Sequence, residues 1–137
     1  MIPLRDSQPS YSAPVATVLL IVANAMAFFY ELALEPFSRN HLIAVFGVVP
    51  DRLWYPSLVT SMFLHAGWLH ILGNMWFLWI YGDNVEDILG RFKYLLLYLG
   101  SGLAAGLTHA LVNPDSHVPT IGASGAVAGV MGAYMVK

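Results

Sequence analysis

A 20-residue apolar run near the N-terminus, Val15 to Leu34, most strongly limits what this chain can fold into. Only Asn24 and Glu31 interrupt it, and a helix of this length crosses a hydrocarbon layer of about 30 Å. A secretory signal peptide is the alternative interpretation. Its apolar core would be shorter, however, and a small-residue cleavage site would follow it. We therefore predict a retained membrane-spanning helix.

The composition of the whole chain also indicates a bilayer. Hydrophobic residues make up 58% of the 137 residues and charged residues 10%, whereas a soluble domain has about 25% charged residues. The net charge of −2 provides no basic patch for nucleic acid. The chain has no cysteine, which excludes disulfides, thiolate metal sites and a cysteine nucleophile. We predict an integral membrane protein that binds no nucleic acid.

The remaining segments predict an all-α, polytopic helical bundle. We expect a polar, flexible lead-in over residues 1–14 and one transmembrane domain over residues 15–137. Within that domain the pattern predicts a membrane-dipping loop over 35–56, a second span within 57–81, a charged connection over 83–93, a third span over 94–112, a polar loop over 113–120 and the start of a fourth span over 121–136. The fourth run is slightly short of a crossing, so we expect the chain to stop inside a larger fold.

Small residues and charges refine this arrangement. Gly102 and Gly106, with small neighbours, predict close helix approach on the third span, and the glycines of the fourth span predict a packing seam. Positive charge favours the cytoplasmic side. It places the N-terminus there, with Arg5, Arg91 and Lys93 inside and Arg39 and Arg52 outside.

Strongly polar residues within spans are costly and are functional candidates by default. His70 and Asn74 are four residues apart, so they share one face of the second span. Ser124, between Gly122 and Gly125, opens the fourth span and can meet Asn74 about 10 Å below the start of the second span. A hydroxyl, a backbone amide at a helix N-terminus and a side-chain amide together suit acyl transfer through an oxyanion. The serine still requires a general base.

Each of these residues also has a plainer interpretation. Ser124 fits a small-residue packing face, and Asn74 fits an interhelical hydrogen bond. His70 and His65 can also be structural histidines. For His109, a position at the membrane–water interface is favoured over the role of a replacement general base. A metal site at His65 and His70 is disfavoured because they lie on different helical faces and lack a nearby carboxylate. His41 and His117 are expected to be solvated, and Arg52 and Trp54 receive no role.

Two motifs in order resemble the rhomboid proteases. They are His65-xxxx-His70-xxx-Asn74 on the second span and Gly122-Ala123-Ser124-Gly125 at the fourth, and the stretch Gly82 to Asp87 resembles bacterial members. The resemblance implies that the chain comprises the first three and a half of the family's six core helices, and that the protein lies in a bacterial plasma membrane. It also implies a Ser–His dyad, without cofactor or metal, that cleaves transmembrane protein substrates near the outer face.

The resemblance also implies residue roles. Ser124 is the nucleophile, Asn74, His70 and the Ser124 amide form the oxyanion site, and His65 supports the adjoining loop. The base is a histidine on the family's sixth helix, so these 137 residues alone are expected to be inactive. Ala128 stands where the family often has tyrosine. Two alternatives are a rhomboid-like pseudoprotease that binds transmembrane clients and an unrelated transporter or channel subunit.

Overall fold

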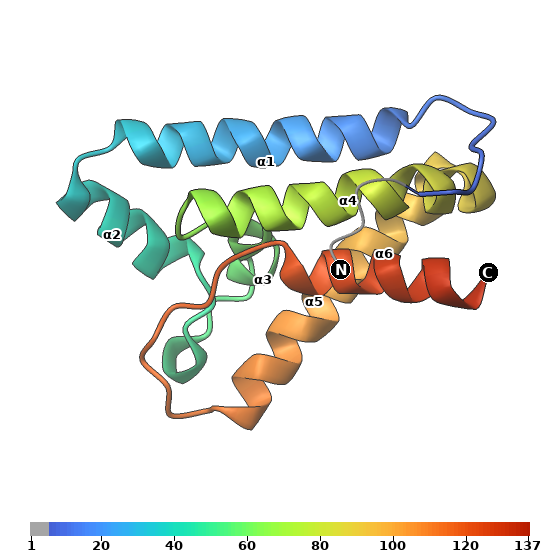
Figure 1. Cartoon of the computed structure of the whole chain (residues 1–137). Coiled ribbons are helices and arrows are strands. Elements are labelled where there is room, and N and C mark those ends of the chain that lie inside the picture. The colour runs from blue at the N-terminus through green and yellow to red at the C-terminus, as the bar shows by residue number, and fades with distance from the viewer. Residues whose placement is uncertain (1–5) are drawn as a thin grey trace.

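Six α-helices and two short 3-10 helices, η1 and η2, make up the regular structure of residues 6–137, the part of the chain that the computed structural model describes (Figure 1). Arg5, which entered the charge argument, lies outside these residues. The elements are α1 (Val15–Ala33), α2 (Pro36–Phe46), η1 (Pro50–Arg52), α3 (Ser57–Thr60), η2 (Ser61–Phe63), α4 (Trp68–Leu89), α5 (Arg91–Val112) and α6 (Ser124–Val136). The predicted all-α class is confirmed.

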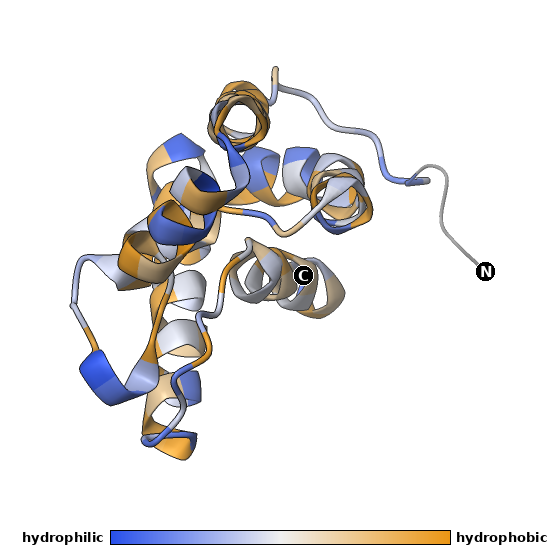
Figure 2. Ribbon diagram, turned by 90° about the vertical axis from the view of Figure 1, so that its left-hand side faces the viewer, coloured by the Kyte–Doolittle hydropathy of each residue, from blue (hydrophilic) through white to orange (hydrophobic). Residues whose placement is uncertain are grey.

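The first and third predicted spans correspond to α1 and α5. Within the described residues these two helices are long and apolar enough to cross a membrane, and α6 is a shorter apolar helix. Large apolar side chains such as Leu19, Met26 and Leu111 remain exposed. Figure 2 accordingly shows apolar stretches on the outer faces of the helices as well as between them. Helices that are apolar on all sides suit a lipid environment.

The predicted charged connection over residues 83–93 is wrong. Helix α4 continues through Asp83 and Glu86 to Leu89, and α5 begins at Arg91. Gly90 alone makes the turn, with φ +78°, a conformation that glycine adopts without steric cost. These charged residues lie on the helix, where the carboxylates of Glu86 and Asp87 accept hydrogen bonds from α1 and from the segment before it.

The carboxylate of Glu86 is buried and caps the N-terminus of α1. It accepts hydrogen bonds of 2.8 Å from the amides of Ala16 and Thr17 and from the Thr17 hydroxyl. These α1 amides have no partner within their own helix, and the negative charge complements the positive end of the helix dipole. The lead-in also attaches to α4, since the Tyr11 amide donates to Asp87 at 3.1 Å.

The second long helix begins later than the predicted second span, and the loop predicted before it is partly helical. Residues 35–56 do not form a span, as expected, but helix α2 occupies much of them, with Pro36 in the first turn where a missing N–H costs nothing. Residues 57–63 form α3 and η2, and the long second helix begins only at Trp68, after Gly67. Helices α1, α4 and α6 then lie side by side (Figure 1).

Two different small-residue faces of α5 make close contacts. A Cβ atom added at Gly125 or Gly129 of α6 would collide with Ala105 or Ser101 of α5. The packing seam predicted for the fourth span therefore exists at these two glycines. Gly102 and Gly106 face elsewhere, towards the side chains of Met62 and Leu58 on η2 and α3, respectively.

Candidate active site

Ser124 is the first residue of α6, and its side chain is exposed. The first hydrogen bond of the helix runs from the Val127 amide to the Ala123 carbonyl at 2.9 Å. The amides of Ser124, Gly125 and Ala126 therefore have no acceptor within the helix. A hydroxyl lies here beside free N–H donors at the positive end of a helix dipole.

The loop that leads to Ser124 is held by backbone hydrogen bonds to distant segments. Val48 and Thr120 exchange two hydrogen bonds, of 2.9 and 2.8 Å, in an isolated antiparallel bridge. The Gly122 amide donates to the carbonyl of Ser61 at 2.8 Å. Gly122 itself has φ +121°, which favours glycine. The sequence patterns missed Val48, Ser61 and Thr120, because backbone pairing leaves no side-chain signature.

His70, in the first turn of α4, lies directly against this loop. A Cβ atom on Gly122 would be 2.6 Å from His70 Nε2, so the ring occupies the space that the missing side chain leaves. The other ring nitrogen, Nδ1, accepts a hydrogen bond from the Ala66 amide at 3.3 Å. In a neutral ring that acceptor role puts the proton on Nε2. His70 thus presents an N–H donor to the loop before Ser124.

Asn74 lies one turn further along α4 and is half-buried. Its Nδ2 donates to the carbonyl of His70 within the same helix at 3.1 Å. This hydrogen bond of Asn74 is therefore to its own helix rather than to Ser124. Because α4 and α6 pack against each other, Asn74 and Ser124 belong to neighbouring helices.

His65 lies in the loop before α4 and is fully buried. Its ring contacts the His70 ring edge-on, with centroids 5.0 Å apart. Neither ring nitrogen has a hydrogen-bond partner among the described residues. Burial, with a smaller effect of His70, lowers the pKa of His65 to about 4. His65 is thus a neutral packing group behind His70.

A cavity of about 200 Å³ adjoins the serine. Ser124, Gly122 and Gly125 are among its lining residues, together with His109 of α5. His109 is half-buried here, and its Nε2 lies 2.8 Å from the Thr120 hydroxyl. The histidine is therefore engaged with the loop that precedes Ser124.

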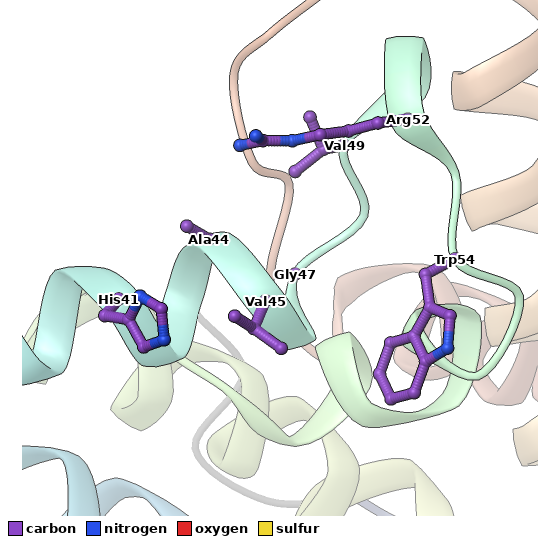
Figure 3. Close-up of a pocket in the computed structure, with 7 residues that line it drawn as sticks. All are labelled: His41, Ala44, Val45, Gly47, Val49, Arg52 and Trp54. Atoms are coloured by element: carbon purple, nitrogen blue, oxygen red, sulfur yellow. The ribbon is translucent and has the colours of Figure 1, made fainter.

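A second cavity, of about 340 Å³, lies between α2 and the η1 region (Figure 3). His41, Arg52 and Trp54 are among its lining side chains, with an apolar wall from α2 that includes Val45. It contains no serine or other nucleophile, so it does not compete with the Ser124 region as a catalytic centre.

The other histidines lie apart from the serine. His117 is exposed and its Nδ1 is 2.5 Å from Asp51 Oδ2, and His41 is also exposed. Within residues 6–137 no three histidine or carboxylate side chains are close enough to hold a metal ion.

Comparison with known proteins places the chain in a family. Residues 50–137, more than half of the chain, match the Rhomboid domain. The chain is 37% identical over 114 residues to "Rhomboid-like protein 11, chloroplastic" of Arabidopsis thaliana, covering 79% of this chain and 40% of that protein. It is 32% identical over 127 residues to "Rhomboid protease GluP" of Bacillus subtilis (strain 168), covering 89% of this chain and 24% of that protein.

A relative without activity is also similar. The chain is 34% identical over 82 residues to "Inactive rhomboid protein 1" of Drosophila melanogaster, covering 60% of this chain and 6% of that protein. The chain thus spans less than half the length of these three relatives. The matched residues include α4, α5 and α6, with both predicted motifs. This chain belongs to the rhomboid family of multi-pass membrane proteins.

Proposed function

We propose that the chain carries the nucleophile and the oxyanion site of an intramembrane serine endopeptidase that cleaves transmembrane protein substrates. The observation that carries the proposal is the contact between His70 and Gly122, two residues before Ser124. It directs a ring N–H towards the loop that ends in an exposed hydroxyl and free helix amides. Such a cluster is suited to stabilise negative charge that develops on a substrate carbonyl.

The proposed roles follow from these positions. Ser124 Oγ attacks the scissile carbonyl, and the Ser124 amide and His70 Nε2 donate to the oxyanion. Asn74 is proposed as a further donor through the second N–H of Nδ2, since one N–H of this group donates to the His70 carbonyl. Loss of one oxyanion donor in a known serine protease costs about 2.7–4 kcal/mol of transition-state stabilisation. Gly122 leaves room for the His70 ring beside the serine, and Gly125 permits the close approach of α5.

The general base is proposed to be a histidine on the family's sixth helix, outside these residues. His109 is the described histidine that shares a cavity with Ser124. Its Nε2 is held by the Thr120 hydroxyl at 2.8 Å, and its Nδ1 lies 3.4 Å from Asn113 Nδ2. Both ring nitrogens therefore have partners other than the serine, so we do not assign it the role of base.

The second candidate is a pseudoprotease that binds transmembrane clients without cleaving them. The similarity to an inactive relative and Ala128 at a position where the family often has tyrosine favour it. Retention of Ser124 with its amide donors favours the protease. A full-length gene product without a histidine on a sixth apolar helix would decide for the pseudoprotease.

The experiment that tests the protease uses a fluorophosphonate probe on the full-length gene product in detergent and in liposomes. We expect labelling and cleavage of a transmembrane substrate by the wild-type protein, and loss of both in Ser124→Ala. Ser38→Ala on α2 is the control, because Ser38 hydrogen-bonds only Glu35 among the described contacts and lies outside the proposed site. Equal labelling of wild type and Ser124→Ala would refute the assignment of the nucleophile.

We also propose a bacterial plasma membrane with the N-terminus in the cytoplasm. Arg91 lies beside Glu86 at the end of the bundle where α1 begins, whereas Arg39 contacts the loop at the opposite end of α4. The chain has no native cysteine, so single cysteines report topology directly. A cysteine at residue 92 should react with an impermeant maleimide only after lysis of spheroplasts, and one at residue 115 before lysis. The reverse pattern would invert the orientation.

A further inference from the structure

A buried charge on α1 faces the loop that precedes His70. Glu31 is fully buried, although it lies in an apolar helix. Its Oε1 accepts a hydrogen bond of 2.8 Å from the His65 amide. A buried carboxylate costs several kcal/mol unless charges and donors compensate it. The donor that compensates this carboxylate is the His65 backbone.

Arg39 of α2 supplies the compensating charge and binds the same loop. Its Nη2 is 3.5 Å from Glu31 Oε2. The same nitrogen donates to the carbonyl of His65 at 3.2 Å and to the carbonyl of Ala66 at 3.0 Å. Two elements that precede the site in sequence therefore hold both sides of the His65 backbone through charged groups.

The carbonyl of His65 and the amide of Ala66 are the two ends of one planar peptide unit. Arg39 binds the oxygen of this unit, and the amide at its other end donates to His70 Nδ1 at 3.3 Å. A positively charged donor on the carbonyl polarises the peptide and strengthens its N–H as a donor. The position and the tautomer of His70 thus depend on the 65–66 peptide, which Arg39 binds directly. Glu31 holds it indirectly, through its ion pair with Arg39 and through the amide of the preceding 64–65 peptide.

We propose that Glu31 and Arg39 are positioning residues for the oxyanion donor. Arg39 acts on His70 directly through the 65–66 peptide, and Glu31 acts through its ion pair with Arg39 and through the adjoining His65 amide. The inference rests on the proposed protease function. Neither side chain is proposed to touch the substrate. Their effect is to keep Nδ1 of His70 hydrogen-bonded, so that the proton stays on Nε2, which faces Gly122 and the loop before Ser124.

The test compares Arg39→Gln and Glu31→Gln with wild type in the full-length gene product, with cleavage of a transmembrane substrate in liposomes as the assay. Because the donor acts in the transition state, we expect kcat to fall about 10-fold while KM changes less than about twofold. Arg39→Lys, which keeps a charge able to reach a carbonyl, should recover part of the loss. Arg52→Gln is the control, since Arg52 lines the separate cavity near α2 (Figure 3) and should leave kcat unchanged.

A double-mutant cycle separates positioning from a merely structural role. In a His70→Ala background the donor is absent, so Arg39→Gln should cause no further loss of kcat. A structural defect would instead multiply the two losses, and that result would overturn the inference. Arg39 is partly exposed, so its variant carries the test where Glu31→Gln yields no folded protein.

The two levels of the proposal fail in different ways. Wild-type kcat in Arg39→Gln and Glu31→Gln, with Ser124→Ala inactive, would overturn only the positioning role. A wild-type protein that neither cleaves substrate nor reacts with the probe would overturn the protease function, and the positioning role with it.

Discussion

Replacement of Gly122 by alanine tests the contact on which the site depends. The backbone there has φ +121°, and a non-glycine residue in such a conformation costs roughly 1–3 kcal/mol. The added Cβ would also lie 2.6 Å from Nε2 and 2.7 Å from Cε1 of His70, well inside van der Waals contact. The imidazole must therefore move away from the loop. A displacement of about 1 Å at a catalytic centre costs as much as 100-fold in rate.

The matched control for this change is Gly132→Ala, on helix α6 that follows the loop. A Cβ at Gly132 meets nothing within 4 Å, and alanine is favoured over glycine in a helix by roughly 0.5–1 kcal/mol. We expect Gly122→Ala to melt at a lower temperature in detergent and to lose about 100-fold in kcat/KM. Gly132→Ala should melt at or above the wild-type temperature with full activity. Wild-type kcat/KM in Gly122→Ala would refute the contact between His70 and the loop as the basis of the site.

Two further changes test stability away from the serine. Glu86→Ala removes three hydrogen bonds to a buried carboxylate and leaves the start of α1 uncapped. We expect the free energy of unfolding, measured in mixed micelles, to fall by about 3–5 kcal/mol. A decrease below about 1 kcal/mol would contradict the capping role. The pKa of His65 is about 4 in the fold and near 6.5 when unfolded. The unfolded chain therefore binds the proton first, and the melting temperature should fall as the pH drops from about 6.5 to 4. His65→Gln should remove that dependence, and an unchanged slope in this variant would exclude His65 as its source.

Hydropathy correctly predicted the long apolar helices. It did not predict the helical segment whose charged side chains make contacts within the protein. Helices α1 and α5 agree with the predicted first and third spans, because an apolar run of this length forms a helix that can cross a membrane. The end of α4 was misassigned, since Glu86 and its neighbours have the polarity of a loop. The sequence alone does not show that Glu86 caps a helix 69 or 70 residues away. Helix α2 was missed for a similar reason, because Pro36 indicates a break unless it lies in a first turn.

For the site, the sequence predicted residue types better than contacts. The spacing of His70 and Asn74 places them on one face of α4, and the hydrogen bond from Asn74 to the His70 carbonyl follows from that spacing. The structure adds the partner that the spacing could not predict, since His70 packs on Gly122. The pairing of Val48 with Thr120 likewise involves backbone atoms alone. Such long-range backbone contacts depend on the folded chain, so no local pattern specifies them.

The two buried carboxylates, Glu31 and Glu86, lie near opposite ends of α4, so each one makes its contacts at a different end of the bundle. His70 and Glu86 are 16 residues apart in the same helix, which corresponds to about 24 Å at 1.5 Å per residue. At one end Glu86 fixes the start of α1; at the other, Glu31 near the end of α1 holds the loop before His70. Helix α1 is thus tied to α4 by a carboxylate at each end. Lipid contributes little to the alignment of two apolar helices. These two polar contacts, together with the packing of Thr17 on Gly82 and of Phe28 on Trp68, therefore set the relative position of α1 and α4 and the height at which His70 meets the loop before Ser124.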